Sequence, residues 1–247
     1  MSSHINSGKK TDILGVSVDA VTRAEALDTL LGFLQSASNH LLFTPNPEIV
    51  LAAQKDPAFK DILNAGDLVV PDGIGLVIAS RFCAVKIKER VAGYDLVLSL
   101  FDAIKGENGT VYFFGGEPGV AEAAKKNIEA AYKGLVVSGC ADGFYDDIKE
   151  REVVKDIQRL KPDILLVGNA FGKQEKWIYA HRDELPVKIT AGVGGSIDGW
   201  AGRVRRAPLF MQKAGLEWLW RLMLQPSRIK RMYKLPLFLF KVIFNIT

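Results

Sequence analysis

The sequence is poor in residues that bind metals or form disulfides. Among its 247 residues there are two cysteines and three histidines. They are scattered along the chain at Cys83, Cys140, His4, His40 and His181. This spacing matches no zinc site and no redox pair, and it indicates reduced thiols of a cytosolic protein. We therefore expect no metal site, no disulfide and no cofactor.

The chain also lacks a long hydrophobic run, and we expect no signal peptide at its start. A membrane-spanning helix needs about 20 consecutive apolar residues, and the apolar stretches here are shorter or are interrupted by charges. The first residues, MSSHINSGKK, are polar and carry no apolar segment of a signal peptide. We predict a disordered tail over residues 1–11 and a cytoplasmic protein.

What the sequence does contain is an alternation of apolar strand-like runs and helix-like segments over residues 12–202. The expected strands are DILGVSV, HLLFTP, DLVV, GTVYFFGG, LVVSGCADGFY, DILLVGNAFG and KITAGVGGS. Continuous apolar strands separated by helices are typical of a mostly parallel sheet. The predicted fold is therefore α/β, a Rossmann-like core with helices on both faces of the sheet.

Polar and glycine-rich loops follow these strands, where parallel sheets bind ligands. In TPNPE, Asn46 caps the next helix, or Thr44 and Asn46 offer hydrogen bonds to a ligand. In FFGGEPG, Gly115 and Gly116 let phosphate oxygens approach the backbone, or they form a tight turn. DGFY brings Phe144 and Tyr145 to the same edge, where they are candidates for substrate binding.

Two further loops carry candidate ligand-binding groups. In GNAFGKQE, Gln174 lies in a solvated first helical turn or reaches a sugar hydroxyl. GVGGSIDG combines Gly194 and Gly195 with Asp198, which favours close backbone approach to a ligand and a carboxylate on ribose hydroxyls. The G-x-G-x-x-G dinucleotide fingerprint is absent, as is a D-x-D pair that would hold a divalent ion on a diphosphate. The adjacent Asp146–Asp147 pair is interpreted as a solvated loop.

LVVPDGIGLV contains one acid, Asp72, between a proline and a glycine. One reading makes Asp72 the N-cap of a helix beginning near Gly73. The other makes it a general base, because apolar surroundings raise the pKa of a carboxylate. Its position after a strand, together with the neighbouring loops, favours the base.

Residues 203–247 differ in kind from the rest. They hold ten basic residues and one acid, whereas the first 202 residues hold 22 basic and 27 acidic residues. Aromatic residues are interspersed at Trp218, Trp220, Phe238, Phe240 and Phe244. This pattern predicts a basic amphipathic helical appendage at an anionic membrane surface. The alternative is a helix docked on its own core, and nucleic acid fits less well because the apolar face would have no partner.

Taken together, the motifs resemble the WecG/TagA/CpsF glycosyltransferases of bacterial cell-surface polymer synthesis. The matching segments are TPNPEIV, PDGIGLV, ERVAGYDLV, FFGGEPGVA, GNAFGKQEKWI, GVGGSIDGWAGRVRRAP and MQKAGLEWLWRLMLQPSRIKR. The resemblance implies inverting, metal-independent transfer of N-acetylmannosamine from UDP-ManNAc to undecaprenyl-diphosphate-linked N-acetylglucosamine, in wall teichoic acid or related polymer synthesis. It also implies a peripheral position on the inner face of the cell membrane.

The resemblance also assigns roles to residues. Asp72 matches the proposed base, and Thr44, Asn46 and Gln174 match polar groups of the donor and acceptor pocket. Asp198 matches a nucleoside contact, and Arg90 falls in a matching segment and is expected to bind substrate. Three arginines of the appendage match groups thought to close on the diphosphate, namely Arg221, Arg228 and Arg231.

Two other classes compete with this reading. A nucleotide-dependent oxidoreductase is opposed by the missing dinucleotide fingerprint, and a noncatalytic membrane-associated scaffold would leave the polar loops without a purpose. The donor sugar, the lipid chain of the acceptor, and the choice between a monomer and a homo-oligomer stay open.

Overall fold

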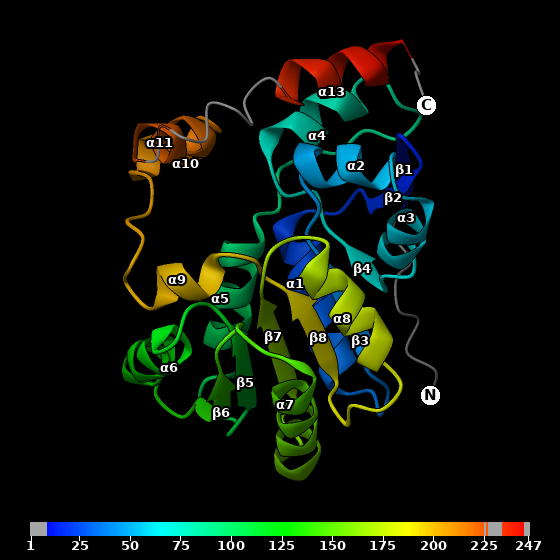
Figure 1. Cartoon of the computed structure of the whole chain (residues 1–247). Coiled ribbons are helices and arrows are strands. Elements are labelled where there is room, and N and C mark those ends of the chain that lie inside the picture. Colours follow the sequence, from blue (N-terminus) through cyan, green and yellow to red (C-terminus); the bar gives the residue numbers. More distant parts are fainter. Residues whose placement is uncertain (1–8, 225, 227–233, 245–247) are drawn as a thin grey trace.

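The structure, a computed structural model, describes residues 9–224, 226 and 234–244. Its centre is a six-stranded sheet in the order β4-β3-β8-β7-β5-β6, in which every neighbouring pair is parallel (Figure 1). The strands are β3 (His40–Phe43), β4 (Leu68–Val69), β5 (Thr110–Gly115), β6 (Val136–Ala141), β7 (Ile164–Gly168) and β8 (Ile189–Gly192). Because all of them are parallel, their carboxyl ends lie at one edge of the sheet.

Helices cover both faces of this sheet, as the continuous apolar strands predict. One face packs against α1 (Arg23–Leu34), α5 (Gly93–Ile104), α6 (Val120–Ala131) and α9 (Ser196–Trp200). The other packs against α2 (Pro47–Ala53), α3 (Pro57–Asn64), α4 (Ile74–Ser80), α7 (Asp147–Leu160) and α8 (Lys173–His181). Each face has its own buried cluster, so the predicted α/β class is confirmed.

Two local predictions are wrong. The DILGVSV segment is a hairpin of β1 (Lys10–Ile13) and β2 (Val16–Asp19), antiparallel and separate from the main sheet. The chain reverses there because Gly15 has φ +85° and its N–H donates to Asp12 Oδ1 at 3.0 Å. The Asp146–Asp147 pair is no loop, since Asp146 Oδ1 caps α7 by accepting from two backbone N–H groups.

The C-terminal part forms α10 (Leu209–Lys213), α11 (Glu217–Leu224) and α13 (Lys234–Ile243). In Figure 1, α13 lies over α2 and α4, and α10 and α11 lie apart from it near the carboxyl edge of the sheet. One side of α13 joins the core through Phe238, which is 0% exposed, and Val242. The prediction that Phe238 supplies apolar area to a membrane is therefore wrong.

The opposite side of α13 is uncovered and apolar. It exposes Leu237, Phe240, Ile243 and Phe244. Within the described ranges, no helix combines the length and the hydrophobicity needed to cross a membrane. The α13 helix is thus docked on the core by one side and exposes an apolar surface on the other.

Candidate active site

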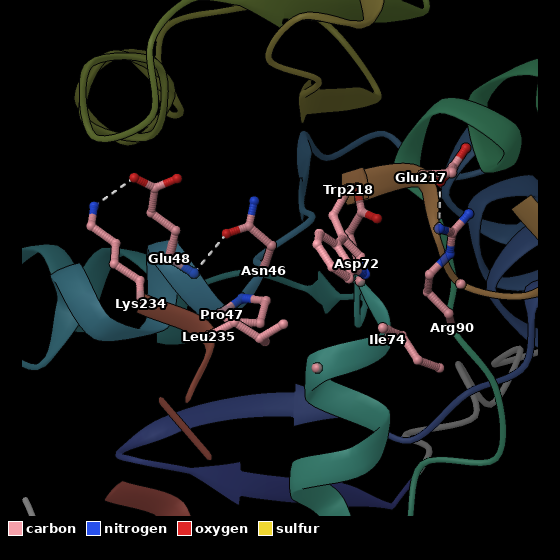
Figure 2. Close-up of a pocket in the computed structure, with 13 residues that line it drawn as sticks. Asn46, Pro47, Glu48, Asp72, Ile74, Arg90, Glu217, Trp218, Lys234 and Leu235 are labelled. Carbon is pink, nitrogen blue, oxygen red and sulfur yellow. Dashed lines mark hydrogen bonds and ion pairs between the residues drawn. The ribbon is translucent and has the colours of Figure 1, made fainter. Parts of the chain in front are cut away.

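A large cleft of about 1090 Å³ lies at the carboxyl edge of the sheet. Every strand of the sheet contributes a loop to its wall, from Thr44 after β3 to Gly194 after β8. A smaller pocket of about 220 Å³ adjoins it between α2, α4, α11 and α13 (Figure 2). The two spaces share four lining residues, Asn46, Glu48, Asp72 and Glu217. A parallel sheet therefore places the predicted loops around one site.

Asp72 lies where the two pockets meet. The N-cap position of α4 is Gly73, which has φ +107°, a conformation that side-chain-bearing residues rarely adopt. Asp72 is thus one residue too early to be that cap, and the cap reading is wrong. The loop is held by backbone hydrogen bonds of 3.0 Å from Asp72 N–H to Pro45 O and from Val91 N–H to Pro71 O. These bonds bring Asp72 beside both the Thr44–Asn46 loop and Arg90.

Asn46 has both of the roles considered for it. Its Oδ1 caps α2 by accepting from the N–H groups of Glu48 at 2.9 Å and Ile49 at 3.1 Å. This cap fixes the amide plane, so its Nδ2 faces away from α2 (Figure 2). Thr44 lines the same cleft, and its hydroxyl donates to Gly192 O at 3.3 Å. The helix cap thus orients a hydrogen-bond donor beside Asp72.

Gln174 is buried within the wall of the cleft, only 4% exposed. Its Oε1 accepts from Gly194 N–H at 2.9 Å, and its Nε2 donates to Glu175 Oε1 at 2.8 Å. Glu175 in turn accepts from Gly172 N–H at 2.6 Å, and burial raises the pKa of its carboxyl. The Gln174 side chain therefore links the start of α8 to the Gly194 loop. Its burial does not agree with the reading of a solvated helical turn.

The predicted phosphate-binding glycines differ in position. Gly116 lines the cleft, but its N–H donates to Gly168 O at 3.1 Å. Gly115 packs so closely on β7 that an added Cβ would lie 2.3 Å from Gly168 O, and it does not line the cleft. Gly194 and Gly195 both line it, although the Gly194 N–H is occupied by Gln174. The tight-turn reading of Gly115 and Gly116 is the one that fits these contacts.

Two aromatic side chains and the predicted nucleoside contact Asp198 also line the cleft. Phe144 and Tyr145 follow β6, and Lys173 Nζ lies 3.8 Å from the centre of the Tyr145 ring. Phe144 is 66% exposed. Burial raises the pKa of Tyr145 to about 12, so its phenol is protonated and can donate. Asp198 lies in the first turn of α9 and lines the same cleft. The cleft thus has apolar rings and a carboxylate acceptor, the kinds of group that bind a nucleoside.

The structure describes only some of the arginines that were predicted to bind substrate. Arg90 lines the small pocket and forms an ion pair with Glu217 of α11. Arg221 belongs to α11, although its side chain lies outside the described residues, as do Arg228 and Arg231 entirely. Sequence reasoning missed Arg206 and Glu217, which also line the cleft. The RVRR run was the signal for Arg206, whereas a lone acid in a basic tail gave none for Glu217.

In the part of the chain that the structure describes, the site contains no cluster of metal-binding side chains. There, no three His, Cys, Asp or Glu residues come together in a way that would hold a metal ion. Basic side chains line both spaces: Lys173, Arg205 and Arg206 line the cleft, and Arg90 and Lys234 line the small pocket.

These features define a class. The protein has an α/β fold with a polar cleft at the carboxyl edge of its parallel sheet, and Asp72 lies with Arg90 and Glu217 where the cleft adjoins the small pocket. The chain belongs to the glycosyl transferase WecG/TagA/CpsF family, whose model matches residues 11–247. It is therefore a glycosyltransferase, and the predicted family resemblance is confirmed.

Similar proteins carry one specific name. A Staphylococcus aureus (strain MRSA252) protein is 33% identical over 235 residues, covering 94% of this chain and 92% of its own length. A Bacillus subtilis (strain 168) protein is 35% identical over 196 residues, covering 79% of this chain and 76% of its own. Both are named N-acetylglucosaminyldiphosphoundecaprenol N-acetyl-beta-D-mannosaminyltransferase.

Proposed function

We propose that this protein transfers N-acetylmannosamine from UDP-ManNAc to undecaprenyl-diphosphate-linked N-acetylglucosamine, with inversion and without a metal ion. The observation that carries the proposal is Asp72, a carboxylate at the junction of a large polar cleft and a smaller, more apolar pocket. The names of the relatives in Staphylococcus and Bacillus support the choice of sugar and acceptor. The product would serve wall teichoic acid or a related surface polymer.

In this proposal Asp72 is the general base. It takes the proton of the acceptor hydroxyl while that oxygen forms a bond to the anomeric carbon of the donor sugar. The bond between the anomeric carbon and the diphosphate oxygen breaks, and UDP leaves with the electron pair. Attack from the face opposite the leaving group inverts the anomeric centre. The large cleft takes the donor and the small pocket takes the acceptor.

The remaining predicted residues hold the substrates. Thr44 and Asn46 lie on the β3 loop beside Asp72, where they orient the reacting sugars. Gln174 acts as a positioning residue through the Gly194 loop, and Asp198 accepts from ribose hydroxyls. Arg90, together with Arg221, Arg228 and Arg231, neutralises the leaving diphosphate.

We further propose that the protein works as a peripheral protein on the inner face of the cell membrane. The exposed apolar side of α13 and the excess of basic residues after position 202 support binding to an anionic lipid surface. A membrane position would bring Asp72 near a lipid-linked acceptor, because α13 and Asp72 both border the small pocket.

The test is transfer activity with a panel of UDP-sugars and a short-chain lipid diphosphate that carries N-acetylglucosamine. UDP-ManNAc should be the preferred donor. Asp72→Asn should lower turnover by about 10² to 10⁴-fold, the range for loss of a general base. The matched control is Asp183→Asn. Asp183 is exposed and pairs with Arg182, whose backbone oxygen accepts from Asn39 just before β3, at the edge of the sheet opposite the cleft. Turnover by Asp72→Asn close to that of the control would refute the role of the base.

A further inference from the structure

Four charged side chains join the core to the appendage beside Asp72. Arg90 Nη1 pairs with Glu217 Oε2, a contact visible in Figure 2. Arg206 Nη2 lies 2.5 Å from Asp95 Oδ2, and Arg206 Nε lies 3.7 Å from Glu217 Oε1. The carboxylate of Glu217 is therefore shared between two guanidinium groups, one from before α5 and one from the segment before α10.

This cluster forms part of the boundary between the two pockets. Arg90 lines the small pocket, Arg206 lines the large cleft, and Glu217 lines both. The side chains of Arg90 and Glu217 are 15% and 18% exposed, so their pairing is only partly screened by water. Arg206 lies over the ring of Tyr94, with its Cζ 4.6 Å from the ring centre, which fixes the plane of its guanidinium.

The charges of the four groups cancel. Two guanidinium groups face two carboxylates, so the cluster offers no net positive charge to an anion in the cleft. A guanidinium fork binds carboxylate and phosphate oxygens with the same geometry. Glu217 pairs with Arg90 Nη1 and lies 3.7 Å from Arg206 Nε, so a diphosphate that uses these donors competes with Glu217 for both arginines.

We infer that Arg206 binds the diphosphate of the nucleotide together with Arg90, and that Glu217 occupies both arginines until the diphosphate displaces it. This inference rests on the proposed function, because it takes a nucleoside diphosphate as the ligand of the cleft. Glu217 is the first residue of α11. Its release thus removes the ion pair that ties the start of this helix to Arg90 of the core when the nucleotide binds, which couples the ligand to the appendage.

The experiment measures binding of UDP and of uridine to the full chain by isothermal titration calorimetry. Glu217→Gln keeps the shape of the side chain but removes the competing charge. It should bind UDP at least about fivefold more tightly than the wild type, the lower end of typical coupling between two ligands. Its affinity for uridine should be unchanged, because uridine has no phosphate. Arg206→Gln should weaken UDP binding and leave uridine binding unchanged.

Glu48→Gln is the matched control. Glu48 also lines both pockets, but it pairs with Lys234 at 2.6 Å and with neither arginine. If a general loss of negative charge were responsible, Glu48→Gln would tighten UDP binding as much as Glu217→Gln, and the inference would fail. If the wild type binds UDP and Glu217→Gln binds it with the same affinity, the inference about Glu217 fails but the proposed function stands. Absence of UDP binding in every protein would overturn the proposed function with it.

Discussion

The docking of α13 can be separated from its predicted contact with lipid by two substitutions in the same helix. Phe238 is 0% exposed and packs in the core cluster, whereas Phe240, two residues later, is 52% exposed. Removing a buried Phe ring typically costs about 3 to 5 kcal/mol. We expect the lower end for Phe238→Ala, because a helix at the surface can partly close the cavity. Phe240→Ala leaves no cavity and should cost little.

The measurement is hydrogen exchange of the backbone amides in residues 238–243. A loss of about 3 kcal/mol in docking corresponds to a roughly 100-fold increase in the open population of the helix. Phe238→Ala should therefore exchange about 100-fold faster there, while Phe240→Ala should exchange at nearly the wild-type rate. The core strand β7 should keep its protection in both variants, which would show that the loss is local.

Binding to phosphatidylglycerol vesicles should give the opposite ranking. Phe240→Ala removes an exposed ring from the apolar side of α13, so its vesicle affinity should fall by about fivefold, which corresponds to about 1 kcal/mol. The reasoning would be refuted by equal exchange rates in the two variants. A Phe240→Ala protein that binds vesicles as well as the wild type would refute only the lipid contact.

Two further predictions concern the site. Burial raises the pKa of Glu175, so the folded chain holds this proton more tightly than the unfolded chain does. The resulting stability is complete below the ordinary glutamate pKa of about 4.3 and is lost as the pH rises through the raised value. Urea unfolding should therefore show Glu175→Gln gaining stability relative to the wild type from about pH 4 upward, and a difference independent of pH would contradict this. Transfer activity should survive EDTA, since arginines supply the positive charge, and activity lost on chelation and restored by magnesium would show that a metal is needed.

Much of the core could be predicted from the sequence because its strands are continuous and apolar. Six of the seven expected strands form the sheet, and their positions brought the polar loops to one edge. The exception is DILGVSV, where a turn at Leu14 and Gly15 interrupts an apolar run without a proline or a charged cluster. Periodicity alone does not distinguish one strand from a short hairpin of this kind.

The site could be predicted in composition but less well in contacts. The motifs identify Thr44, Asn46, Asp72 and Asp198, and all four line the cleft. They do not show that both polar atoms of the Gln174 side chain form hydrogen bonds within the protein. Those bonds depend on two segments 20 residues apart coming together. They also do not show the pairing of Arg90 with Glu217, which are 127 residues apart. Such pairings depend on how distant segments pack together, which local sequence patterns do not specify.

In the C-terminal helix, docking on the core and contact with a membrane do not exclude each other. Apolar residues in LPLFLFKVIF occupy more of the helix surface than one face, so some must lie against the core and others must not. The structure assigns Phe238 and Val242 to the core and leaves Leu237, Phe240, Ile243 and Phe244 outside. Since Lys234 and Leu235 of the same helix border the pocket beside Asp72, a contact made on the outer side would be transmitted to the acceptor site through a rigid helix. The proposed lipid contact and Asp72, the proposed base, would thus be connected through α13.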